Sequence, residues 1–186
     1  MNTILGLSLA AFTELHVVIS LIGIVAGLVF FAALIGGRWL SLINGLFLVF
    51  TILTSVTGFL FPPKPIGPPF IFGVVSLVVL AVALYALYGR KLAGGWRRVF
   101  LVTALFAQWL NMVVLVVQSY QKIPALHALA PIGNEPAVLA TQGVVAIVIL
   151  YLITRRLLRP LSGIEHAAAR ISAGDLSCRS GISQQD

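Results

Sequence analysis

The chain has 186 residues, of which 60% are apolar and only 9% are charged. Ordinary soluble domains carry roughly 25% charged residues, so this composition excludes a water-soluble globule. It also excludes a disordered chain, which would need few apolar residues and much charge. The mean hydropathy of +1.07 therefore indicates an integral membrane protein, with the lipid bilayer as its first expected partner.

Five apolar runs, each bounded by charge, Pro or Gly, are long enough to cross a bilayer core about 30 Å thick. They cover residues 14–36, 40–61, 70–89, 99–119 and 137–154. The sequence thus predicts an all-α fold, with a transmembrane domain of five helices over residues 1–154. Residues 155–186 are expected to form a cytoplasmic segment that contains a short amphipathic helix. Thr13 and Glu14 are expected to mark the outer boundary of the first span.

Two connections have their own sequence features. Residues 61–69 hold five of the nine prolines, which predicts a stiff extended turn between the second and third spans. In the connection over residues 120–136, a short apolar stretch at 123–130 is expected to rest on the membrane surface.

The basic residues predict the orientation, because Lys and Arg are enriched in cytoplasmic loops. Of the 12 Lys and Arg, only Lys64 and Lys122 fall in the connections on the side opposite the C-terminus. The C-terminus is therefore expected in the cytoplasm and the N-terminus outside. A net charge of +7 also raises the possibility of nucleic-acid binding. These charges lie singly or in pairs at helix ends, however, so no nucleic-acid partner is expected.

Polar side chains inside the predicted spans fall on one face of the second helix and one face of the fourth. They form what we call the polar stripe: Asn44, Thr51, Ser55, Gln108, Asn111 and Gln118. The favoured interpretation is that the two faces meet and hydrogen-bond, at about 0.6 kcal/mol per contact. The alternative is a polar path or a small-ligand pocket. No ionisable residue lies at mid-span, which argues against ion-coupled transport.

Small residues and histidines raise two further questions. Gly23 and Gly27 form a small-xxx-small pattern that lets helices approach closely, with a partner inside or outside the chain. His16 and His127 are weak candidates for a metal site on the outer side, because imidazole is a common ligand. Glu14 and His16 do not share a helix face, and the loop residues show no ligand spacing. We therefore expect no metal site and no cofactor.

No catalytic constellation is recognisable, and the protein is not expected to be an enzyme. The tail after the fifth span has apolar positions at Leu161, Ile164, Ala168 and Ile171. Steps of three and four residues form a narrow seam of the coiled-coil type. Gly174 is expected to end this helix.

The tail resembles the first helix and the start of the connector of a HAMP domain, over about residues 157–183. The resemblance rests on Pro160, Leu161, Ile164, Ala168, Ile171, Gly174, Asp175 and Leu176. HAMP domains are dimeric linker modules that join membrane spans to output domains. In that family the proline opens the first helix, the seam packs in a parallel four-helix bundle and Gly-Asp-Leu begins the connector.

The membrane part, through residues 15–23 and 53–59, is similar to an uncharacterised group of small bacterial multi-span membrane proteins. Together the two resemblances imply the sensory and transmission part of a HAMP-type transducer in a bacterial inner membrane. The chain would be a homodimer through the tail helix and would lack an output domain, either because the chain is truncated or because the half-module is a remnant. The alternative is a small structural or permeation-type membrane protein with no signalling role.

Overall fold

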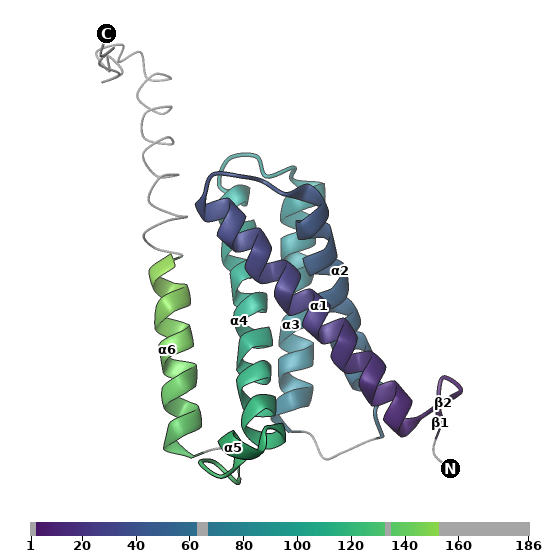
Figure 1. Cartoon of the computed structure of the whole chain (residues 1–186). Coiled ribbons are helices and arrows are strands. Elements are labelled where there is room, and N and C mark those ends of the chain that lie inside the picture. Colours follow the sequence, from purple (N-terminus) through teal and green to yellow (C-terminus); the bar gives the residue numbers. More distant parts are fainter. Residues whose placement is uncertain (1–2, 63–66, 133–134, 153–186) are drawn as a thin grey trace, which may run out of the picture.

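The computed structural model of the chain describes residues 3–62, 67–132 and 135–152 (Figure 1). Most of these residues are helical, which confirms the all-α prediction; a small hairpin at the start is the exception. The predicted tail helix and every HAMP-like residue from Pro160 to Leu176 lie outside the described residues.

The first helix begins earlier than predicted. Strands β1 (Thr3–Ile4) and β2 (Leu7–Ser8) pair antiparallel, and helix α1 follows directly as Leu9–Ile35. The Ser8 hydroxyl accepts a hydrogen bond from Ala11 N at 3.3 Å and so caps the helix. The Thr13 hydroxyl donates to the Leu9 carbonyl at 2.7 Å, so a polar residue expected at the membrane boundary fits inside α1.

Helix α2 covers Ser41–Phe59, and helix α3 covers Pro68–Leu84. The turn expected over residues 61–69, between the second and third spans, overlaps α3, because Pro68 and Pro69 belong to the first turn of that helix. Proline suits that position, since the first helical N–H groups have no partner within the helix. At Gly73, a Cβ would lie 2.8 Å from Phe59 Cζ, so α2 and α3 approach closely there.

The third predicted span is not a single α-helix. Its last five residues form the π-helix η1 (Tyr85–Gly89), closed by a hydrogen bond from Arg90 N to Tyr85 O at 2.9 Å. A short connection over residues 90–95 follows, with positive φ at Lys91, Leu92 and Gly94. The polypeptide thus reverses within six residues.

The second half of the chain contains helices α4 (Trp96–Lys122), α5 (Pro124–His127) and α6 (Pro136–Leu152). The one-turn helix α5 lies within the apolar stretch that was expected to rest on the membrane surface. Helices α1 to α4 run alternately in opposite directions, α1 packing most extensively on α2 and α3 on α4 (Figure 1). Helix α6 lies outside this bundle, alongside α4.

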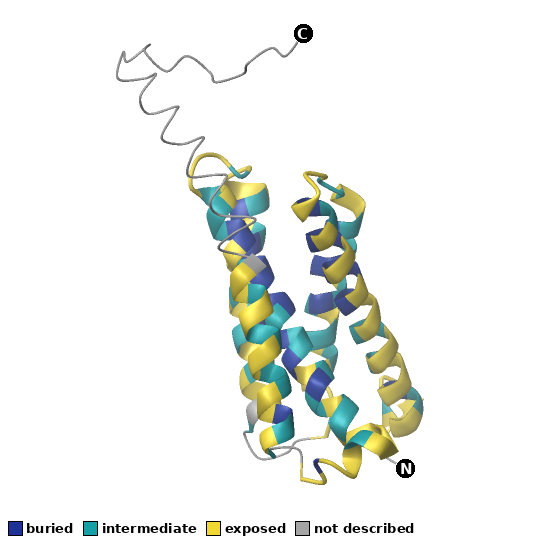
Figure 2. Cartoon of the chain, turned by 60° about the vertical axis from the view of Figure 1, so that its left-hand side comes forward, coloured by how far each residue is buried: buried dark blue, intermediate teal, exposed yellow. Residues whose placement is uncertain are grey.

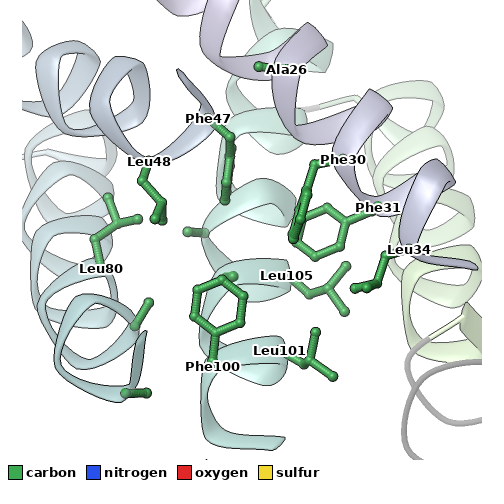
Figure 3. Packing of buried hydrophobic residues seen from close by; sticks show 14 residues of the cluster. Ala26, Phe30, Phe31, Leu34, Phe47, Leu48, Leu80, Phe100, Leu101 and Leu105 are labelled. Carbon is green, nitrogen blue, oxygen red and sulfur yellow. The ribbon is translucent and has the colours of Figure 1, made fainter. Parts of the chain in front are cut away.

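The largest core cluster takes residues from all four bundle helices and from η1, but none from α6 (Figure 3). Its members are Ala26, Phe30, Phe31, Leu34, Phe47, Leu48, Leu80, Ala83, Ala86, Phe100, Leu101, Ala104, Leu105 and Ala107. The Phe30 ring lies edge-on to Phe31 and to Trp39, each with ring centroids 5.2 Å apart. Edge-on pairs contribute about 0.5–1.5 kcal/mol each beyond the area that they bury.

The outward faces of the helices are exposed and apolar (Figure 2). Val78 on α3 and Val25 on α1, for example, are more than half exposed. Such continuous apolar surface is stable only in a lipid environment. Four helices, α1 to α3 with η1 and α4, are long and apolar enough to cross a bilayer, so the chain is a membrane protein. The described part of α6 is a shorter apolar helix, and a fifth crossing stays a prediction.

The described ionisable residues are divided between the two ends of the bundle. We call the end with the connections over residues 36–40 and 90–95 the basic end, because Arg38, Arg90, Lys91, Arg97 and Arg98 lie there. The opposite end carries the hairpin, the connection before α3, and α5. It holds Lys122 and both described acidic residues, Glu14 and Glu135.

Candidate functional site

The best-defined polar contact inside the bundle joins α4 to α1. Gln108 is 2% exposed, and its Nε2 donates to the Ile24 carbonyl at 3.2 Å. A Cβ on Gly27 would overlap Gln108 Oε1 and lie 2.8 Å from Phe47 Cδ2. Residue 27 must therefore be glycine for the glutamine amide to reach the α1 backbone.

Gly23, one turn before Gly27, faces α2. A Cβ at Gly23 would lie 3.3 Å from both Phe50 C and Thr51 N, so the backbones of α1 and α2 pass very close there. The sequence left open whether this small-xxx-small pattern meets a partner inside or outside the chain. Both glycines pack within the chain, one against α2 and the other against Gln108 and α2.

A second polar contact joins α2 to α4. Thr51 is fully buried, and its Oγ1 accepts a hydrogen bond from Asn111 Nδ2 at 3.2 Å. The two halves of the predicted polar stripe therefore meet at Thr51 and Asn111. A neutral contact of this kind contributes about 0.6 kcal/mol on average inside a membrane.

The remaining polar-stripe residues do not make this kind of cross-helix contact in the described part of the chain. The Ser55 hydroxyl donates to the Thr51 carbonyl of its own helix at 3.2 Å, as serines in membrane helices commonly do. Gln118 is exposed. Asn44 is 3% exposed, and its Oδ1 has no hydrogen-bond partner. The stripe is therefore a set of separate contacts rather than one continuous seam.

Ser76 on α3 adds a third helix to this polar layer. Leu48 and Leu80 point toward each other (Figure 3), and α2 and α3 run antiparallel. Thr51 and Ser76 lie one turn further in the same direction, so they occupy the same level of the bundle. Ser76 is 4% exposed, and its Oγ has no partner, not even in its own helix. A single serine in a long apolar run gave too weak a signal for the sequence to predict this position.

The polar contacts described so far are hydrogen bonds between neutral groups, and no charged side chain takes part in them. Buried Gln108 Oε1 and Asn44 Oδ1 are acceptors without a partner in the described residues, and the buried Ser76 hydroxyl can donate and accept but does neither there. The Trp109 indole N–H is a buried donor without a partner. An unpaired buried polar group costs about 1–3 kcal/mol, so each of these atoms would gain from a further hydrogen bond.

The weak metal candidates lie at the opposite end of the bundle. His16 Nδ1 lies 2.7 Å from Thr57 Oγ1, and the Thr57 hydroxyl in turn donates to the Leu53 carbonyl at 2.7 Å. The ring is therefore the donor in the first bond, and Nδ1 carries the hydrogen. The His16 ring also packs edge-on to Phe61, with centroids 5.2 Å apart. His16 thus pins α1 to the end of α2.

His127 lies on α5 and is exposed. Among the described residues, no three His, Cys, Asp or Glu side chains come close enough together to hold a metal ion. Glu135 Oε1 instead accepts a hydrogen bond from Ile132 N at 2.7 Å, in the connection that leads into α6. The His16 and Glu135 side chains thus have structural contacts.

The attachment of α6 to the bundle was not predicted from the sequence. Tyr120 Oη and Thr141 Oγ1 lie 3.0 Å apart, and Val138 is buried against Val116 and Ala130. All these contacts involve α4 or the connection after it, and they lie near the start of α6.

Comparisons with known proteins were made at three levels. No family model, no curated protein and no solved structure matches this chain.

Proposed function

We propose that the chain is the membrane-embedded input and transmission part of a HAMP-type signal transducer, with α6 as the transmitting helix. The observation that supports this most strongly is the place of α6 outside the core, against one face of α4 (Figure 1). A transmitting helix must shift relative to its bundle without unfolding it.

The α6 interface is small compared with the core. In the part of the chain that the structure describes, α6 is held on α4 by the hydrogen bond between Tyr120 and Thr141 and by a short seam that includes Val138 and Val145. The main core cluster contains no α6 residue. A shift of α6 would therefore disturb few buried contacts, whereas a shift of α1 would break the Gln108 contact and the aromatic packing of Phe30.

The orientation that we propose puts the basic end in the cytoplasm and the N-terminus outside. Five of the six Lys and Arg in the described residues lie at the basic end, Lys122 being the sixth. Positive residues are retained on the cytoplasmic side of a membrane, and the membrane that we propose is a bacterial inner membrane. Helix α6 runs toward the basic end and leads in sequence into the segment that resembles HAMP.

A second copy of the chain is the partner that this proposal requires, because HAMP modules are dimers. The α6 face turned away from α4 is apolar and exposed. It consists of Leu139, Val144, Ile147, Val148, Leu150 and Tyr151. Lipid would cover this face in a monomer, and the same face of a second α6 would cover it in the dimer. No catalytic step and no cofactor form part of this proposal.

The alternative of a permeation protein has less support. A polar path would have to continue from Gln108 to the basic end of the bundle. That half is filled by the aromatic cluster around Phe30, Phe47 and Phe100, each of which is fully buried. The described polar contacts thus end at a packed apolar layer.

Cysteine cross-linking along α6 in intact membranes tests the proposal. The native Cys178 is first replaced by serine, because it is the only cysteine in the chain. Single cysteines at positions 144, 147, 148 and 151 sample the exposed face, and Val78→Cys on α3 is the control with similar exposure. We expect disulfide-linked dimers at one or two of the α6 positions and none at position 78.

Two results would overturn the proposal. Absence of dimers at all four α6 positions would remove the homodimer along the transmitting helix. Equal cross-linking at position 78 would indicate random collision, since Val78 lies on α3 and not on α6.

A further inference from the structure

Four exposed basic residues gather at the basic end of the bundle. Arg38 comes from the connection after α1, Arg90 and Lys91 from the connection after η1, and Arg97 from the start of α4. We call these four residues the cationic cluster. In the described residues, no carboxylate lies at this end, because Glu14 and Glu135 are both at the opposite end.

Aromatic side chains hold part of this cluster in place. The Arg90 guanidinium lies 5.2 Å from the centre of the Trp96 ring, a cation–π contact. Tyr85 packs edge-on to the same ring, with centroids 5.3 Å apart. Arg90 N also donates a hydrogen bond to Tyr85 O, which closes the π-helix and brings Arg90 close to Tyr85.

The cluster is electrostatically unfavourable without an anion. Arg97 lies in the first turn of α4, where no acidic residue is present and where the helix dipole already contributes a partial positive charge. Arg90 and Lys91 lie in the connection between η1 and α4, so these two positive charges are only a few residues from Arg97 in the sequence. A negative charge from outside the described residues would reduce the repulsion among these positive charges and would interact favourably with the helix dipole.

The aromatic residues also indicate how deep the cationic cluster lies in the bilayer. Tyr85 and Tyr88 in η1 are more than half exposed, and Trp96 begins α4. Trp and Tyr at helix ends favour the headgroup layer of a bilayer. Trp39 packs on Phe100 in the early part of α4, with centroids 5.6 Å apart, and this contact brings the neighbouring Arg38 to the same region.

We propose that the cationic cluster is a binding site for the phosphate of an anionic phospholipid headgroup. Arginine presents a planar fork of donors that matches phosphate oxygens, and Lys91 adds a point charge. The exposed apolar faces of α3 and α4 next to the cluster would receive the acyl chains. This inference does not depend on the signalling role proposed above.

Native mass spectrometry of the purified full chain in detergent tests this site. The probes are phosphatidylglycerol and phosphatidylcholine with identical acyl chains, and the variant is Lys91→Gln/Arg97→Gln. Because each basic residue contributes about fivefold to the binding of anionic lipid, we expect the loss of two to lower phosphatidylglycerol affinity by about 25-fold. Phosphatidylcholine binding should be weak and unchanged.

Two controls and a second test variant make the experiment specific. Lys122→Gln removes one charge at the opposite end and should leave phosphatidylglycerol binding unchanged. Lys91→Arg/Arg97→Lys keeps the charge and should retain the binding. Arg38→Gln changes a separate connection, and it should lower the affinity even if the double variant fails to fold.

Three outcomes would overturn the proposal. One is equal binding of phosphatidylglycerol by the native chain and by both glutamine variants of the cluster. Another is equal binding of the two lipids by the native chain. A third is displacement of phosphatidylglycerol by millimolar inorganic phosphate, which would make free phosphate and not lipid the occupant.

Discussion

Replacing Gly27 with alanine should destabilise the bundle strongly. The new Cβ would overlap Gln108 Oε1 and lie 2.8 Å from Phe47 Cδ2, so the glutamine amide must leave the α1 backbone. Its hydrogen bond to the Ile24 carbonyl is then lost. Overpacking costs typically about 1–3 kcal/mol and a membrane hydrogen bond about 0.6–1.7 kcal/mol, so we expect a loss of about 2–5 kcal/mol.

The assay is reversible unfolding in mixed micelles with increasing sodium dodecyl sulfate, followed by the fluorescence of the three tryptophans. Gly45→Ala is the matched control, because a Cβ at Gly45 would meet nothing within 4 Å. Its unfolding free energy should stay within about 1 kcal/mol of the native value. Gly27→Ala combined with Gln108→Ala should lose less than the sum of the single losses, since the shorter side chain removes the overlap. Equal stability of Gly27→Ala and Gly45→Ala would show that the bundle does not need a glycine at position 27.

Two further substitutions test the other polar contacts. Asn111→Leu removes the bond to Thr51, and a double-mutant cycle with Thr51→Val should give a coupling of about 0.6 kcal/mol; a coupling of zero would show that the two side chains do not interact. Tyr120→Phe removes the hydroxyl that meets Thr141, which is worth about 0.5–1.5 kcal/mol, so α6 amides should exchange hydrogen about 2- to 12-fold faster while α3 amides are unchanged. Unchanged exchange in α6 would contradict the attachment described above.

Composition and periodicity were enough to predict the helices that cross the membrane, because about 20 consecutive apolar residues have few alternatives to a spanning helix. The ends were less predictable. Ser8 caps α1 before the expected start, and Pro68 begins α3 inside the expected turn. The π-helix at Tyr85–Gly89 is followed by Arg90, which lies against the Trp96 ring, and a local apolar pattern encodes neither feature.

The polar interior was predictable only in part. Heptad-like spacing placed Thr51 and Asn111 on facing helices, and they do meet. The same spacing gave no sign that Gln108 would turn to α1, because that depends on the absence of a side chain at Gly27. Ser76 carried no periodic signal. Tertiary packing, which sequence periodicity does not describe, decides which polar residues find partners.

The central claim is that α6 crosses the membrane, so that the residues before and after it lie on opposite sides. Labelling of intact cells with a membrane-impermeant maleimide tests this claim directly. The native chain reports the tail through Cys178, and Ile132→Cys in a Cys178→Ser background reports the connection before α6, where Ile132 is 77% exposed. We predict labelling at position 132 in intact cells and at Cys178 only after permeabilisation. Labelling of both positions in intact cells would contradict the account.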